Sequence, residues 1–130
     1  MESYRARKMA RLSKTEKLIK RGEVWTVDLR PGAGCELAKI RPALIVSNDT
    51  VNVISPTAII IPISSQIPPF IGPDRVFVSK KDLELSKDSV ILCGQIRSID
   101  KVRLKKKIGT LPKTKLHDVE EAIRLILSLS

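Results

Sequence analysis

The sequence has little of several residue types on which common folds and enzymes depend. Only 3% of its 130 residues are aromatic, so aliphatic Val, Ile and Leu must fill the core. The two cysteines, Cys35 and Cys93, are too few for a disulfide framework or a four-cysteine zinc site. The single histidine, His117, excludes any mechanism that needs a histidine pair within one chain.

Long apolar runs are also missing. No stretch reaches the roughly 18 residues that a membrane span requires, and the basic N-terminus lacks the apolar segment of a secretory signal. At 42%, hydrophobic residues are still frequent enough to form a core, and 130 residues is a typical length for one domain. We therefore expect a cytoplasmic protein that has no membrane partner.

Basic charge gathers in two blocks. The sequence has 24 Lys and Arg against 14 Asp and Glu, a formal net charge of +10. Residues 1–21 carry a net +6 and residues 101–115 a net +7, while the middle of the chain is nearly neutral. Such blocks favour a polyanionic partner, either nucleic acid or an acidic protein. For residues 1–21 we favour a role in solubility; for Lys105, Lys106 and Lys107, solubility and phosphate contact are equally supported.

The hydrophobic pattern predicts strands from residue 23 onward. Pro62, inside one of the apolar runs, predicts a bulge or a sheet edge. Residues 48–55 suit a turn or a single helical turn, and Pro112 opens a predicted helix over 113–127. Short strands closed by a helix predict a mostly β fold with α (α+β), a small, partly open β-barrel. The predicted strands cover 23–29, 41–47, 57–64, 75–78, 89–95 and 106–111.

Residues 1–20 are predicted to form a basic extension separate from a domain over residues 21–130. Ser13-Lys14-Thr15-Glu16 has the form of a helix-capping box ahead of Leu18 and Ile19. We therefore predict one or two short helices in the extension.

An ordered set of short motifs spans about residues 21 to 127. In this order and spacing, the set resembles the MazF/PemK toxins, the ribonuclease toxins of bacterial toxin–antitoxin pairs. The motifs are Arg21-Gly22-Glu23-Val24-Trp25, Arg41-Pro42-Ala43-Leu44-Ile45-Val46-Ser47-Asn48-Asp49, Ser55-Pro56-Thr57, Ser89-Val90-Ile91-Leu92 and Gln95-Ile96-Arg97-Ser98-Ile99-Asp100.

The resemblance implies a fold, an activity and partners. Members of the family fold as a small SH3-like β-barrel of the CcdB/MazF type with a C-terminal helix, and they form homodimers. They cleave single-stranded RNA at short sequences without metal, and an antitoxin with an acidic, largely unstructured tail blocks them. We therefore expect a sequence-specific endoribonuclease that inhibits translation and growth and needs no cofactor. Its expected partners are single-stranded RNA, a cognate acidic antitoxin and a second copy of the chain.

Metal-free RNA cleavage proceeds by attack of the 2′-OH on phosphorus, which leaves a cyclic phosphate and a 5′-OH. Groups must assist deprotonation, balance the phosphorane charge and protonate the leaving oxygen. The resemblance places the family's catalytic arginine on Arg41, whose planar fork suits two phosphate oxygens. It places the active-site threonine on Ser64, which keeps the hydroxyl but lacks the methyl that restricts the threonine rotamer.

Further site residues are predicted with alternatives. Glu36 is a candidate general base, but it could equally orient Arg41 or be a solvated loop acid. Gln95 either reads a base edge or holds a loop, and Arg97 either contacts phosphate or pairs with Asp100. Gly94 stands where the family commonly has an acid, and Trp25 is a core anchor rather than a stacking platform. The residues predicted to bind RNA are Lys39, Asn48, Ser65, Gln66, Gln95 and Arg97.

Two other functions compete with the nuclease. A CcdB-like gyrase poison would share the barrel and the dimer, but that group depends on a C-terminal Trp-Gly-Ile, and this chain ends in Leu127-Ser128-Leu129-Ser130. If the residues at positions 64 and 94, Ser64 and Gly94, do not support catalysis, the protein would only bind RNA or antitoxin. The Arg41-Pro42 pair and the Ser64 hydroxyl favour the nuclease.

Overall fold

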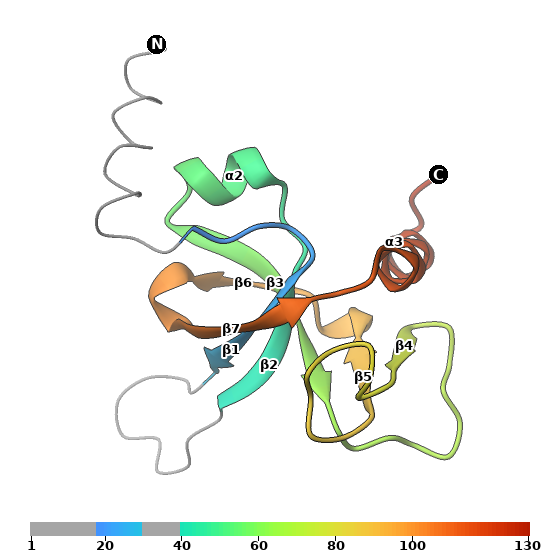
Figure 1. Ribbon diagram of the computed structural model, residues 1–130. Coiled ribbons are helices and arrows are strands. Elements are labelled where there is room, and N and C mark those ends of the chain that lie inside the picture. The colour runs from blue at the N-terminus through green and yellow to red at the C-terminus, as the bar shows by residue number, and fades with distance from the viewer. Residues whose placement is uncertain (1–17, 30–39) are drawn as a thin grey trace.

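The computed structural model describes residues 18–29 and 40–130. Over these ranges the chain forms an antiparallel sheet of seven strands with a long C-terminal helix beside it (Figure 1). This confirms the predicted mostly β fold with a C-terminal helix. The elements are β1 Glu23–Asp28, β2 Ile40–Ile45, α2 Asp49–Ile54, β3 Thr57–Ser64, β4 Arg75–Val78, β5 Ser89–Leu92, η1 Cys93–Gln95, β6 Arg97–Asp100, η2 Lys101–Arg103, β7 Leu104–Thr110 and α3 Lys113–Leu127.

Strand β3 lies at the centre of the sheet. The strand order is β4-β5-β3-β2-β1-β7, and β6 also pairs with β3. On one side β3 pairs with β2; on the other it pairs with β6 through Thr57–Ile60 and then with β5 through Ile63 and Ser64. Pro62 therefore falls where one partner strand gives way to the next. The predicted edge or bulge was wrong, because a break in the ladder inside the sheet also accommodates a residue without an N–H.

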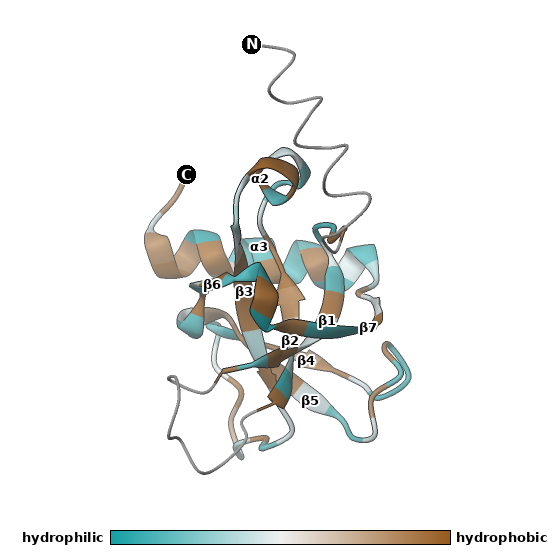
Figure 2. Ribbon diagram, turned by 90° about the vertical axis from the view of Figure 1, so that its left-hand side faces the viewer, coloured by the Kyte–Doolittle hydropathy of each residue, from teal (hydrophilic) through white to brown (hydrophobic). Residues whose placement is uncertain are grey.

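Apolar side chains of β2 and β3 are buried on both faces of the sheet. Leu44 and Ile61 pack in a core that includes Val119 of α3, whereas their neighbours Ile45 and Ile60 pack in a second core with Trp25. Because successive strand residues point to opposite faces, burial on both sides produces the nearly continuous apolar run of β3. Strand β3 accordingly appears mainly brown, that is hydrophobic, in Figure 2, whereas β7 at the edge of the sheet appears mainly teal.

Helix α3 covers the first core. Val119 and Ala122 are buried, and Leu116, Ile123 and Ile126 pack against the same core, so the helix predicted over 113–127 is confirmed. The helix ends at Ser128, whose left-handed backbone lets its N–H bond back to the last turn. None of the helices in the described ranges is long and apolar enough to cross a membrane.

Three element predictions need correction. Residues 93–95 form the 3-10 helix η1 instead of extending β5, and β7 begins at Leu104 instead of residue 106. Strand β6 was not predicted, because only Ile99 in it is buried and one apolar residue gives no periodic signal.

The chain just before β1 packs against the domain. Ile19 is buried in the second core, and the Arg21 amide donates to Asp49 Oδ1 at 2.7 Å. The guanidinium of Arg21 donates to the Val46 carbonyl and pairs with Glu120 of α3. Trp25 is buried, with Nε1 donating to Glu23 Oε1 at 3.0 Å, which confirms it as a core anchor. The helices predicted from the capping box at 13–16 lie outside the described residues.

Candidate active site

Arg41 and Ser64 occupy neighbouring strand ends. The antiparallel β2–β3 ladder ends with the pair Ala43 and Pro62. Arg41 precedes Ala43 by two residues and Ser64 follows Pro62 by two residues, so both lie beyond the same end of this ladder. The sheet thus brings together two residues that are 23 positions apart in the chain.

The Ser64 hydroxyl accepts one hydrogen bond and still has its own proton to donate. It is buried, and its Oγ accepts the Gln66 amide N–H at 3.1 Å. Within the described part of the chain, no acceptor takes the hydroxyl proton of Ser64. The hydroxyl is therefore positioned to donate to an oxygen that enters from outside.

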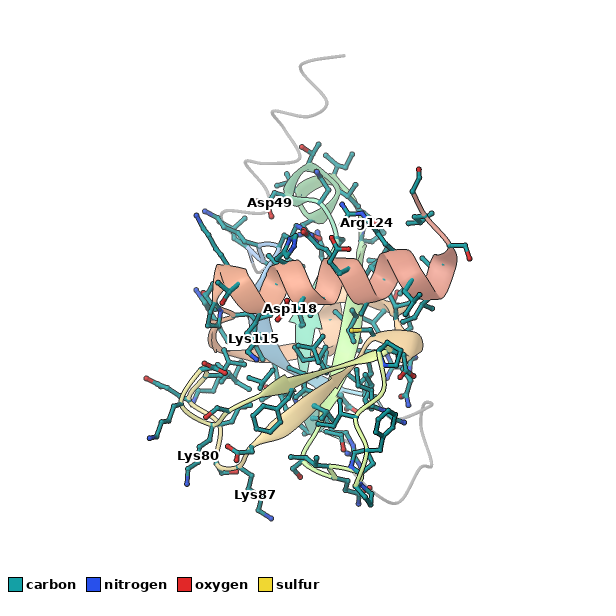
Figure 3. The ribbon with its side chains drawn as sticks, turned by 90° about the vertical axis from the view of Figure 1, so that its right-hand side faces the viewer. Asp49, Lys80, Lys87, Lys115, Asp118 and Arg124 are labelled. Carbon is teal, nitrogen blue, oxygen red and sulfur yellow. The ribbon has the colours of Figure 1, made fainter. Side chains whose placement is uncertain are left out.

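The guanidinium of Arg41 is half-buried, and no carboxylate in residues 18–29 or 40–130 pairs with it. Arg41 borders a hollow of about 490 Å³ that opens between β2, β3 and the connection from β4 to β5. Lys87, which extends outward from that connection in Figure 3, adds a second positive charge to the hollow, and Glu84 adds a negative one. The remaining lining residues are Ile40, Pro42, Ile63, Ser65, Leu85, Ser86, Ser89 and Ile108.

A second hollow, of about 380 Å³, lies on the other side of the end of β3. Because side chains alternate along a strand, Ser65 borders the Arg41 hollow while Ser64 and Gln66 border this one. We call it the Ser64 hollow. Arg75, the first residue of β4, also lines it, although no motif in the sequence points to that arginine. The other lining residues are Ile67, Pro68 and Leu92.

Each of the two hollows therefore has an arginine in its lining, Arg41 in one and Arg75 in the other, and Ser64 lines the second. Arginine forks match phosphate oxygens in pairs. Among the described residues, no group of three His, Cys, Asp or Glu is arranged to hold a metal ion.

The family model of the PemK-like, MazF-like toxins of type II toxin–antitoxin systems matches residues 20–127. The chain belongs to this toxin family. The match includes the strands that carry Arg41, Ser64 and Arg75, so the resemblance read from the sequence motifs is confirmed.

Solved structures of similar fold support the same assignment. A MazE–MazF structure from Deinococcus radiodurans is 24% identical, with a TM-score of 0.74 over 88% of this chain and 99% of that chain. An endoribonuclease from Mycobacterial species is 19% identical, with a TM-score of 0.71 over 87% and 94% of the two chains. An endoribonuclease in complex with its cognate antitoxin, also mycobacterial, is 21% identical, with a TM-score of 0.69 over 86% and 97%. At these identities the likeness concerns the fold of the toxin family.

Other predicted site residues lie at differing distances from this centre. Asn48 stands beyond the far end of β2 from Arg41, where its Oδ1 caps α2 by accepting the Thr50 amide at 2.8 Å. Gln95 and Arg97 are exposed on η1 and β6, and the alternative pairing of Arg97 with Asp100 is absent from the described ion pairs. Glu36 and Lys39 lie outside the described residues.

The space beside Gly94 is open, and the carboxylate of Asp74 lies next to it. A Cβ built at Gly94 would meet only Asp74 Oδ2, at 4.0 Å. The position where the toxin family commonly carries an acid is therefore open, and Asp74 brings a carboxylate to it from the loop before β4. Beside it, burial and then the Asp74 charge raise the pKa of the Cys93 thiol to about 11, so this thiol is not a nucleophile near neutral pH.

Proposed function

We propose that this toxin is a metal-independent endoribonuclease that cleaves single-stranded RNA by attack of the 2′-OH on the adjacent phosphorus. The observation that carries the proposal is that Arg41 and Ser64 lie beyond the same end of the β2–β3 ladder, each beside a hollow that reaches the solvent. The same fold in endoribonucleases from Mycobacterial species supports it.

In this mechanism, Arg41 stabilises the negative charge that builds on the phosphorane oxygens, because no carboxylate of the described residues pairs with its guanidinium. Ser64 donates a hydrogen bond from its hydroxyl to another phosphoryl oxygen. Arginine holds its protons too tightly to act as the general base, and Glu36 is the candidate for that role. As the 2′-oxygen bonds to phosphorus, the bond from phosphorus to the 5′-oxygen breaks and that oxygen takes a proton from water, so the products are a 2′,3′-cyclic phosphate and a 5′-OH.

The decisive test incubates the purified protein with a long RNA in excess EDTA. We expect a ladder of discrete fragments with 5′-OH ends and cyclic phosphates, because cleavage is confined to short sequences. A protein that leaves RNA intact but inhibits DNA gyrase would instead be a CcdB-like poison. Binding of RNA without any cleavage would identify the binding-only alternative.

We further propose that a cognate acidic antitoxin is a partner and competes with RNA. The structural likeness to a MazE–MazF complex supports this partner. Lys105, Lys106 and Lys107 are exposed on β7, at the free edge of the sheet, where an acidic tail would find a row of cations. Antitoxin peptide should therefore displace RNA, and added salt should weaken both complexes.

A homodimer is the proposed assembly. Leu129, just beyond α3, is exposed and lines a hollow together with exposed Ile59 and with Ile96 and Ile123. Apolar side chains that gather on one surface mark an interface. Light scattering should give twice the mass of one chain, and a stable monomer at working concentration would contradict the proposal.

A further inference from the structure

The Ser64 hollow carries a positive charge that nothing nearby neutralises. Arg75 is the one charged residue among those that line it, and the side chain is half-buried. No carboxylate in the described ranges pairs with its guanidinium. The adjacent acid, Asp74, points elsewhere, because its Oδ1 and Oδ2 lie 3.0 and 4.0 Å from where the Cβ atoms of Gly72 and Gly94 would be. A half-buried arginine without a carboxylate partner is suited to bind an anion that enters from solvent.

An exposed aromatic ring lies two residues beyond Pro68, which lines the same hollow. Phe70 is 77% exposed, more than any other large hydrophobic residue of the described ranges, in a chain with four aromatic residues. Its Cε2 lies 3.8 Å from where a Gly72 Cβ would be, and the Gly72 carbonyl accepts the Arg75 amide at 3.2 Å. The Phe70 ring therefore lies against the turn from Gly72 to Arg75.

The segment that presents this ring is stiff. Pro68 and Pro69 precede Phe70, and Pro73 follows Gly72, so three of these residues have a fixed φ. A Cβ at residue 72 would come within 3.0 Å of Asp74 Oδ1, which favours glycine in the turn. An aromatic side chain held on a stiff segment loses little entropy when a ligand stacks on it.

From these observations we propose that the Ser64 hollow is a nucleotide-binding subsite for the residue of single-stranded RNA next to the cleaved bond. Arg75 binds a phosphate of the strand, and Phe70 stacks on a base. Gln66, which is exposed at the same hollow, presents an amide to the base edge. A cation beside an exposed ring is the combination that recognises unpaired nucleotides. An acidic peptide would use the cation but not the ring.

The inference rests on the proposed ribonuclease function, so its test separates binding from cleavage. The probe is a fluorescein-labelled RNA 12-mer that carries 2′-O-methyl groups throughout and therefore cannot be cut by 2′-OH attack. Its sequence is taken from a site cut by the wild-type protein, or is a mixed pool of 12-mers if no site is cut. The variants are Phe70→Ala, Phe70→Trp, Arg75→Ala and, as a charge-loss control, Lys80→Ala. Lys80 extends into solvent from the end of β4 (Figure 3) and lines neither hollow.

Phe70→Ala should weaken binding of the 12-mer about 5-fold to 100-fold, the range for loss of one stacked base. Phe70→Trp should retain the affinity. Arg75→Ala should weaken binding and lower the salt dependence, the slope of log K against log[salt], by about 0.7, the value for one phosphate contact on a single strand. Lys80→Ala should bind as the wild type does, and all variants should keep the wild-type melting temperature.

The possible failures can be told apart. Unchanged binding by Phe70→Ala and Arg75→Ala, in a protein that cleaves RNA, would overturn the subsite and leave the ribonuclease function intact. Binding that depends on both residues, in a protein that never cleaves, would overturn the ribonuclease function and support the subsite. If an Asp- and Glu-rich peptide loses affinity with both variants while RNA does not, the surface belongs to a protein partner and the inference is wrong. A wild-type protein that binds no RNA overturns both.

Discussion

The two ends of the β2–β3 pair use polar side chains in opposite ways. At the end next to α2, Asn52 is 2% exposed, and its Nδ2 donates to the Ser47 carbonyl at 2.9 Å. The Ser47 hydroxyl bonds Asn52 Oδ1 and accepts the Ile59 amide, and buried Lys101 donates to the Asn52 carbonyl. At the other end, Arg41 and Arg75 have no carboxylate partner among the described residues, and Ser64 keeps a free hydroxyl proton.

Polar side chains therefore stabilise the fold at one end of the strand pair and remain available to a ligand at the other end. Buried polar groups that satisfy one another lower the free energy of the fold and leave nothing for a ligand. Donors without a partner contribute little to folding but can bind an incoming anion. Substitutions at the two ends should accordingly affect different measurements, either stability or activity.

The largest effect is expected at Arg41. Arg41→Ala should lower the cleavage rate about 10²-fold to 10³-fold, the usual loss for one donor that stabilises a developing charge, with an unchanged melting temperature. Arg41→Lys should restore little activity, because a point charge does not reproduce a two-pronged contact. Single-turnover cleavage of one RNA measures both variants. Arg124→Ala, which removes a surface arginine paired with Glu121, is the control. Full activity in Arg41→Ala would remove Arg41 from the mechanism.

Ser64 should give the next largest effect. Ser64→Ala removes the donor and should slow cleavage about 10²-fold. Ser64→Thr should preserve or raise the rate, because the added methyl restricts the hydroxyl to fewer rotamers. The same single-turnover assay applies, with Ser98→Ala as an exposed serine control on β6. If Ser64→Thr inactivates the protein, the match of this position to the family threonine is incorrect.

At the α2 end, a substitution should lower the stability of the protein and leave RNA cleavage unchanged. Asn52→Ala should destabilise the protein by about 1–3 kcal/mol, because it leaves the Ser47 hydroxyl and carbonyl without their buried partner. The positions at which RNA is cut should not change. Chemical unfolding measures the first quantity, and fragment mapping the second. Thr50→Ala, on the exposed side of α2, should have little effect on either. An altered cleavage pattern in Asn52→Ala would mean that this end takes part in recognition.

The smallest effect concerns pH. Burial opposes ionisation of Glu23, but hydrogen bonds from Trp25, Lys107 and the Lys20 amide outweigh it, so its pKa lies below the ordinary 4.5. A lowered carboxyl pKa stabilises the fold above the unfolded-state value, and this stability is lost as pH falls through the folded-state value. Melting temperature should therefore fall on acidification below about pH 4.5, and Glu23→Gln should flatten that decline. Because Lys107 is half exposed, its pair with Glu23 contributes only about 0.2–1 kcal/mol. Equal pH profiles for the two proteins would contradict this assignment.

Local sequence patterns predicted most of the helices and strands. They did not predict Arg75, whose position in the candidate site depends on the pairing of strands that are distant in the chain. Helix α3 and strands β1 to β4 followed from apolar periodicity, and the break at Pro112 set the start of the helix. Arg41 and Ser64 were predicted from the family motif. Arg75 was not, because in the sequence it is only the first residue of a short strand. It reaches the site through β5, where Leu92 pairs with Arg75 and Val90 pairs with Ser64, and no local pattern encodes that pairing.

The break in the ladder at Pro62 has a consequence for motion. Only two residue pairs, Ile63–Ile91 and Ser64–Val90, join the β4–β5 hairpin to the rest of the sheet by backbone pairing. Elsewhere the hairpin is held by apolar contacts such as those of Val76 and Val78, which have no directional preference and permit small shear displacements. We expect the amides of β4 and β5 to exchange with deuterium sooner than those of β1 and β2. An RNA strand that contacts both Arg41 and Arg75 would then link the slower-exchanging strands β1 and β2 to the more mobile β4–β5 hairpin. Bound RNA should therefore slow amide exchange most in the hairpin.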